Sequence, residues 1–89
     1  MELTSTEVKQ DLMNRLKRIE GQVRGVQLMV DEERDCAAIL QQMTAIRSAV
    51  HQASLVLARA YATRCLQEPA PGDTDMMLDQ LMATLRKLE

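Results

Sequence analysis

The most constraining feature of this sequence is the run from Asp35 to Leu66, which contains no glycine, no proline and no acidic residue after Asp35. Its apolar residues recur at alternating spacings of four and three, at Ile39, Met43, Ile46, Val50, Ala53, Leu57 and Ala60. This is the heptad pattern of a long α-helix that packs against other helices. We therefore expect the chain to be organised around one long helix.

Two cysteines, Cys36 and Cys65, stand near the ends of this run. At the rise of an α-helix they would be roughly 43 Å apart within one chain, so they cannot meet in a monomer. If two copies of the helix pack antiparallel about a two-fold axis near Val50 and His51, Cys36 of one chain faces Cys65 of the other. The pattern therefore predicts two equivalent dithiol sites between subunits.

A first long helix is predicted before this run. Thr4 and Glu7 have the spacing of a capping box, which places the start of the helix at Thr4. The apolar positions again alternate in spacings of four and three, at Leu12, Leu16, Ile19, Val23, Val26 and Val30. Gly21 and Gly25 interrupt this helix on one face. They either permit close approach of another helix or a ligand, or are breaks that packing tolerates.

The charged cluster from Asp31 to Asp35 predicts a tight connection between the two helices. Asp35 is a suitable N-cap for the second helix, which places Cys36 in its first turn. There the free N–H groups and the helix dipole stabilise a thiolate. Cys65 would lie in the last turn, where the dipole acts in the opposite sense, so Cys36 is the better candidate nucleophile.

A third, short helix is predicted after the segment QEPAPGD, residues 67–73, which breaks the second helix. Asp73 or Thr74 would cap it. Its amphipathic pattern consists of Met77, Leu78, Leu81, Met82, Leu85 and Leu88. We expect this helix to pack across the ends of the two longer ones.

The composition predicts a single domain over residues 1–89 that depends on oligomerisation. The chain has no Phe, no Trp and one Tyr, so its core must be aliphatic, and a chain of this length buries too little surface alone. Neither a membrane span nor a leader is indicated, and we expect a cytoplasmic protein without membrane contact. In that reducing compartment the cysteines are a metal or redox site, or are inert.

The charge is segregated although the net charge is only −2. Cations crowd residues 14–24 and the second helix has no acid from Cys36 to Gln67, whereas acids collect elsewhere. Such a basic surface is typical of proteins that bind DNA phosphates. The candidate DNA-binding residues are Arg15, Lys17, Arg18, Arg24 and Arg47.

No catalytic triad, phosphate loop or paired carboxylate is visible, so we expect neither an enzyme nor a resident cofactor. His51, the only histidine, would lie about 21 Å from either cysteine along a helix. A three-ligand metal site that uses His51 is therefore not expected. An alternative of another class is a helical interaction module that binds a partner protein, with both cysteines as inert filler.

The sequence RLKRIEGQVRG from Arg15 to Gly25, followed by Asp35-Cys36, IRSA from Ile46 and Cys65, resembles the copper-sensing operon repressor family. The resemblance implies an all-α fold with two long helices and one short helix per chain. It implies an antiparallel four-helix-bundle dimer that assembles into a disc-like homotetramer. It also implies a transcriptional repressor that binds operator DNA without a helix-turn-helix, with an inducer site shared between subunits.

The pattern departs from the copper-sensing members at the inducer site. Their Cys, His, Cys set corresponds to Cys36, Tyr61 and Cys65, and Asp35 and Leu81 stand where they have a Tyr and a Glu. The two cysteines without the histidine resemble the persulfide-sensing sulfurtransferase-operon repressors. We therefore expect persulfide or polysulfide to link Cys36 and Cys65 and lower the operator affinity. The alternative is Cu(I), which the same two thiolates can hold.

Overall fold

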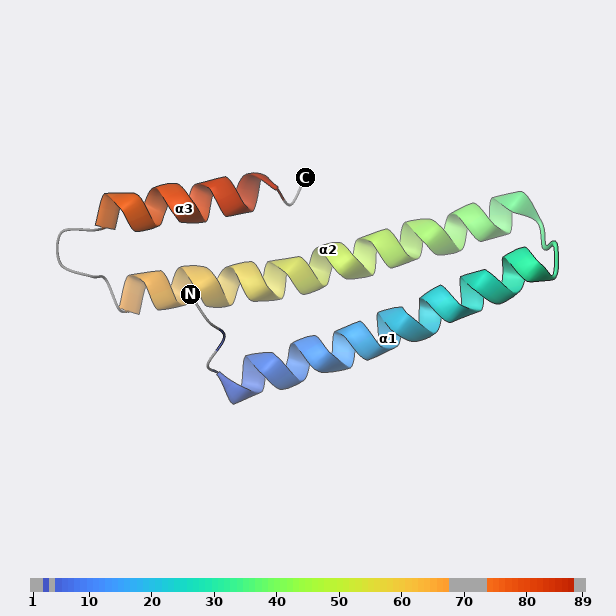
Figure 1. The fold of residues 1–89 in the computed structure, drawn as a ribbon, viewed down its shortest axis with the longest axis horizontal. Helices are drawn as coiled ribbons and strands as arrows, with labels where there is room; N and C mark the ends of the chain where they lie inside the picture. Colours follow the sequence, from blue (N-terminus) through green and yellow to red (C-terminus); the bar gives the residue numbers. More distant parts are fainter. Residues whose placement is uncertain (1–2, 4, 68–73, 88–89) are drawn as a thin grey trace.

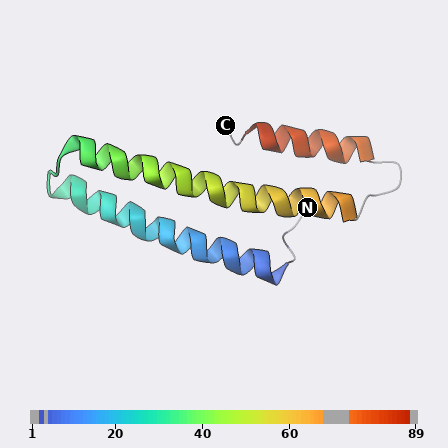
Figure 2. The same ribbon diagram turned by 180° about the vertical axis from the view of Figure 1, so that it is seen from behind.

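Three α-helices form the described part of the chain in the computed structural model: α1 (Thr6–Asp31), α2 (Cys36–Gln67) and α3 (Thr74–Arg86). The structure describes residue 3 and residues 5–67 and 74–87, the side chains of residues 74, 75 and 77 excepted. α1 and α2 form an antiparallel hairpin, and α3 runs back along the C-terminal half of α2 on the side away from α1 (Figures 1 and 2). The predicted all-α chain with two long helices and one short helix is confirmed.

The N-terminus of α1 is capped by Ser5 rather than by Thr4. The hydroxyl of Ser5 accepts a hydrogen bond from the Val8 N–H at 3.4 Å, and the Ser5 backbone is extended. Because this backbone turns the hydroxyl over the first turn, the helix begins at Thr6, and the predicted start at Thr4 is corrected. Thr4 itself lies outside the described residues, as do the segment 68–73 and the proposed cap Asp73.

The connection between α1 and α2 is as tight as predicted. Glu33 has a left-handed backbone with φ 55°, and the N–H groups of Glu33 and Arg34 donate to the carbonyls of Val30 and Met29 at 3.1 and 2.9 Å. These two bonds are those of a Schellman motif, which satisfies the free carbonyls at the end of a helix. The motif reverses the chain within residues 32–35, so that α2 starts directly beside the end of α1.

α3 packs along the side of α2, so the prediction that it crosses the ends of both long helices is wrong. Among the described residues α3 contacts α2 and not α1. Leu81 of α3 is buried and Leu85 is half-buried. A short apolar stripe covers more of its surface when it lies along one helix than when it crosses two helix ends, and α2 offers that length.

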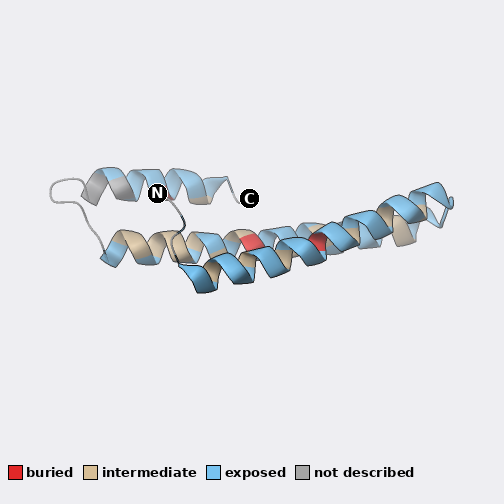
Figure 3. Ribbon diagram, turned by 60° about the horizontal axis from the view of Figure 1, so that its bottom comes forward, coloured by how far each residue is buried: buried red, intermediate tan, exposed pale blue. Residues whose placement is uncertain are grey.

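The described part of the chain has very little core. Only Ile19, Ala53 and Leu81 are buried, one from each helix, and most of each helix is exposed (Figure 3). The Cα atoms extend over 57 × 26 × 13 Å with a radius of gyration of 17.2 Å. A compact chain of this length would have a radius of gyration of about 12 Å. The helices therefore form a thin layer whose broad faces are uncovered.

Half of each predicted heptad seam is not used within the chain. The positions that face the neighbouring helix are at least half-buried, as at Ile19, Val26, Ile46 and Ala53. The other positions are 41 to 58 % exposed and recur every seven residues: Leu16, Val23, Val30, Met43, Val50 and Leu57. The first three lie on α1 and the last three on α2. On each helix the row is rotated by a similar angle, in the same sense along the chain, from the residues that pack in the hairpin. Because the two helices are antiparallel, the two rows point to the same broad side of the hairpin. We call these six residues the apolar face.

No helix in the described ranges is both long and apolar enough to serve as a membrane span.

Candidate functional site

Cys36 is the first residue of α2, and its side chain is exposed. Asp35 caps the helix: its carboxylate accepts from the Ala38 N–H at 3.2 Å and its carbonyl accepts from the Ile39 N–H at 3.0 Å. The prediction that Asp35 is the N-cap is confirmed. Cys36 is therefore accessible to solvent at the N-terminus of a helix.

Cys65 lies in the last turn of the same helix and is half-buried. Tyr61 precedes it by one turn and is also half-buried. The two cysteines occupy the two ends of one continuous 32-residue helix, about 43 Å apart, so the prediction that they cannot meet within a chain is confirmed. A site that uses both thiols needs a second copy of the chain.

In the part of the chain that the structure describes, ligands for a conventional metal site do not converge. No group of three or more His, Cys, Asp or Glu residues able to hold a metal ion occurs among the described residues. His51 is exposed in the middle of α2, far from both cysteines. Leu81, at the position where the resemblance places a Glu in copper sensors, is 8 % exposed and buried against α2, so this position supplies no polar contact.

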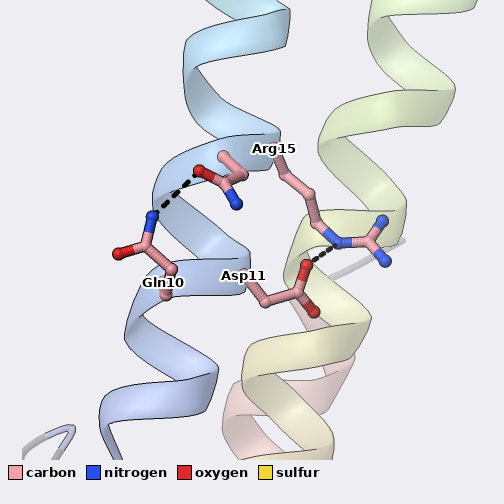
Figure 4. Close-up of polar contacts among 4 residues, drawn as sticks. Gln10, Asp11 and Arg15 are labelled. Carbon is pink, nitrogen blue, oxygen red and sulfur yellow. Dashed lines mark hydrogen bonds and ion pairs between the residues drawn. The ribbon is translucent and has the colours of Figure 1, made fainter.

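The first candidate DNA-binding residue, Arg15, lies on the side of α1 that faces α2. Its Nε donates to the carboxylate of Asp11 at 2.9 Å, and its side chain is 36 % exposed. Figure 4 shows this pair in front of the hairpin, beside a second i,i+4 bond from Gln10 to Asn14 at 3.0 Å. A phosphate that binds Arg15 must therefore compete with Asp11.

The other four candidates, Lys17, Arg18, Arg24 and Arg47, are all exposed. Lys17 and Arg24 are seven residues apart and share the face of α1 that points away from α2. Arg18 lies about 100° further round the same helix, and Arg47 lies on α2. One chain does not bring these residues into a single stripe, and any continuous basic surface depends on assembly.

Gly21 and Gly25 lie within an unbroken helix. A Cβ atom added at either position would meet no atom within 4 Å. Close packing inside the chain therefore does not require either glycine. The alternative left open by the sequence, close approach of something outside the chain, is the one that this open space allows.

Sequence reasoning overlooked one basic residue beside these candidates. Lys87, at the C-terminal end of α3, lines the same groove as Arg47 and His51 on α2. The pair Arg86-Lys87 at the end of a predicted helix was the available signal. It was missed because the sequence does not show where the third helix packs.

The described part of the chain is all-helical and carries one free cysteine at each end of its longest helix. The model of a family described as metal-sensitive transcriptional repressor matches residues 8–87, and this match defines the class of the protein as a transcriptional repressor and not an enzyme. The chain belongs to this family, which includes the copper-sensing repressors.

Three relatives place the chain more closely. The copper-sensing transcriptional repressor CsoR of Bacillus subtilis (strain 168) is 38 % identical over 84 residues, which cover 93 % of this chain and 83 % of that protein. The copper-sensing transcriptional repressor RicR of Mycobacterium tuberculosis is 34 % identical over 87 residues, 93 % of this chain and 90 % of that protein. The crystal structure of the copper-sensing repressor CsoR with Cu(I) from Geobacillus thermodenitrificans NG80-2 has a TM-score of 0.86 and 39 % identity, covering 98 % and 92 % of the two chains.

These relatives confirm the predicted repressor family and not the predicted branch. All three are named as copper-sensing, and none is named as a persulfide sensor. Membership of a repressor family also favours operator DNA as the partner over the alternative of a plain interaction module.

Proposed function

We propose that this chain is a DNA-binding repressor whose operator affinity is set at a dithiol site formed by Cys36 of one subunit and Cys65 of the partner subunit. The observation that carries the proposal is the position of the two thiols at opposite ends of one unbroken helix. Antiparallel pairing of two such helices about an axis near Val50 and His51 brings each Cys36 beside the other chain's Cys65. The same pairing produces two identical sites.

The exposed surface supports such an assembly. The chain exposes 7208 Å², whereas a compact folded protein of its mass would expose about 5,200 Å². The excess of roughly 2,000 Å² per chain is what a large obligate interface covers. The apolar face supplies its core. We propose that two hairpins pack through this face as a four-helix-bundle homodimer, and that two dimers form the homotetramer.

Cu(I) is the inducer that the relatives favour. Soft thiolates select Cu(I), and two of them suffice for linear coordination, so the two donors present suit this ion chemically. Tyr61 in place of the histidine of copper sensors leaves the third position without a soft ligand. Cu(I) held by these two thiolates alone would order fewer groups, and we therefore expect weaker coupling between copper binding and DNA release than in a three-ligand sensor.

Persulfide or polysulfide is the second candidate inducer, and the exposed thiol of Cys36 at a helix N-terminus supports it. The Cys36 thiolate would attack the outer sulfur of an organic persulfide and release the organic thiolate. Cys65 of the partner subunit would then attack Cys36 sulfur and expel hydrosulfide. The two thiols are thereby oxidised to a disulfide and the transferred sulfur is reduced. Longer polysulfides would leave a trisulfide or tetrasulfide bridge.

Operator DNA would be held mainly by phosphate contacts from the exposed cations. The proposed contact residues are Arg15, Lys17, Arg18, Arg24 and Arg47. Neutralising phosphates releases counterions, so the affinity should fall steeply with salt. Replacing Arg18 by Ala should lower the salt dependence by about one phosphate contact.

The function is tested by a fluorescence titration of labelled upstream DNA with the reduced protein, with Cu(I)-loaded protein and with persulfide-treated protein. We expect tight binding by the reduced protein and weaker binding after the true inducer, by about 150-fold if the coupling is about 3 kcal/mol. Cys36→Ser and Cys65→Ser should each bind DNA and fail to release it. Release by Cu(I) alone identifies a copper sensor, and release by persulfide alone identifies a persulfide sensor.

Tyr61→His restores the histidine of the copper sensors and therefore distinguishes the two candidate inducers. It should strengthen Cu(I) binding and copper-driven release and leave the persulfide response unchanged. No operator binding by the reduced protein at low salt would refute the repressor function.

A further inference from the structure

A groove of about 580 Å³ runs along the middle of α2, beyond the end of α3. It is lined by Thr44, Arg47, Ser48, His51 and Ser54 of α2 and by Lys87 from the C-terminal end of α3. Val50 of the apolar face also lines it. The two cysteines do not line this groove, which is therefore a second concave surface separate from the dithiol site.

The groove gathers positive charge without an opposing carboxylate. Arg47 and His51 lie on α2, and Lys87 directly follows the end of α3. None of the groove-lining residues is acidic, and α2 has no Asp or Glu anywhere along its length. Within the described ranges, the side chains of Arg47, His51 and Lys87 make neither hydrogen bonds nor ion pairs. Cations that converge without counter-charges favour an anionic ligand.

Two of the three hydroxyl groups in the groove already donate a hydrogen bond within α2 and are not free to donate to a ligand. Thr44 and Ser54 donate to their own helix, to the carbonyls of Leu40 and Val50, each at 3.0 Å. The donors left for a ligand are the Arg47 guanidinium, the Lys87 ammonium, the His51 ring N–H and the Ser48 hydroxyl. A guanidinium fork matches the paired oxygens of a phosphate and an ammonium adds a point charge.

We propose that this groove is a binding site for phosphate groups, in which Arg47 and Lys87 hold the anion. The phosphate can come from a free polyphosphate or from the backbone of bound DNA, and both present the same oxygens. In either case Lys87 gives the C-terminal end of α3 a binding role.

The groove lies on the same side of α2 as the two cysteines. Positions 36, 47, 54 and 65 follow at steps of 11, 7 and 11 residues and so form one column along α2. If the proposed two-fold axis is correct, and this point rests on that assembly, two grooves lie side by side at the centre of the dimer. Bound anions would then offset the repulsion between two Arg47 and two Lys87 side chains.

The test uses the full chain and sodium tripolyphosphate as the probe. The melting temperature is measured with tripolyphosphate and with sodium chloride at equal ionic strength, because ligands that bind the folded state raise it. Lys87→Gln and Arg47→Gln should lose the specific increase. Arg86→Gln and Arg59→Gln remove the same charge from the same two helices outside the groove and should keep it.

A titration of labelled upstream DNA with increasing tripolyphosphate distinguishes the two sources. If DNA uses the site, tripolyphosphate displaces DNA from the wild type beyond its ionic-strength effect, and Lys87→Gln lowers the slope of log affinity against log salt by about 1. If a free anion uses it, stabilisation occurs without displacement and the slope is unchanged. Equal stabilisation in groove and control variants, or none beyond that of sodium chloride, overturns the proposal even if the protein binds its operator.

Discussion

Asp35 acts at the start of α2 as a cap and as the charged neighbour of Cys36. Its carboxylate accepts from the Ala38 N–H, so it satisfies one of the free donors at the helix N-terminus. The same carboxylate belongs to the residue directly before Cys36 and would repel a negatively charged reagent that approaches the thiol. Capping and reactivity can therefore be separated by substitution.

We expect Asp35→Ala to destabilise the fold by about 1 kcal/mol through loss of the cap, and Asp35→Ser to restore most of this because serine caps well. Both variants remove the carboxylate and its charge, so both should speed the reaction of Cys36 with a negatively charged thiol reagent. Thermal unfolding and the labelling rate are the two measurements. An unchanged labelling rate in Asp35→Ser would show that the carboxylate does not influence Cys36.

Local chemistry explains which residue-scale predictions succeeded. The cap at Asp35 was predictable because the charged cluster before Cys36 offers one clear boundary. At the start of α1, Thr4 and Ser5 are adjacent and both are good caps, so the capping-box spacing from Thr4 to Glu7 selected the wrong one by a single residue. The role of Lys87 depends on where α3 lies, which no local pattern contains.

Gly21 and Gly25 lower the stability of α1, and no contact within the described part of the chain explains why these residues are glycines. Gly25 lies seven residues after Arg18 and so on the same face, in open space. Gly25→Ala should stabilise the helix by about 1 kcal/mol. It should also weaken operator binding, because the added methyl group would hinder close approach of DNA beside Arg18.

Lys9→Ala, on an exposed face of α1 outside the candidate set, is the control for this measurement. A Gly25→Ala protein that is more stable and binds DNA as tightly as the wild type would show that the glycines are only tolerated.

The heptad patterns predicted the two long helices and their apolar positions, but not which of these positions pack inside the chain. Two rows of apolar residues make up the heptad pattern of α2, one with Ile46 and Ala53 and the other with Val50 and Leu57. The spacing alone does not distinguish them. The structure assigns the first to the hairpin and leaves the second exposed. The position of α3 was also unpredictable, because its amphipathic stripe fits the side of a helix or a pair of helix ends.

Because the apolar face is uncovered in the single chain, we expect the stability of the whole molecule to depend on its assembly with other copies. Leu57 lies on this face and is 44 % exposed in the single chain. Leu57→Asp would bury an unpaired carboxylate in the proposed dimer, at a cost of roughly 3–5 kcal/mol, and so weaken association by roughly 100-fold or more.

Gln52→Asp introduces the same charge on the exposed, polar side of α2 and should leave the assembly intact. Sedimentation at matched protein concentrations compares the two variants. If Leu57→Asp sediments like the wild type, the apolar face is not the subunit interface.

The central claim is that each sensing site takes one cysteine from each of two chains. The most direct test mixes Cys36→Ser chains with Cys65→Ser chains, refolds them together and treats them with a short bis-maleimide. Neither variant alone has a Cys36–Cys65 pair in any dimer, whereas a mixed dimer has one. We predict a covalent dimer on a denaturing gel from the mixture and monomers from each variant alone. Monomers from the mixture, or equal cross-linking of either variant by itself, would contradict the account.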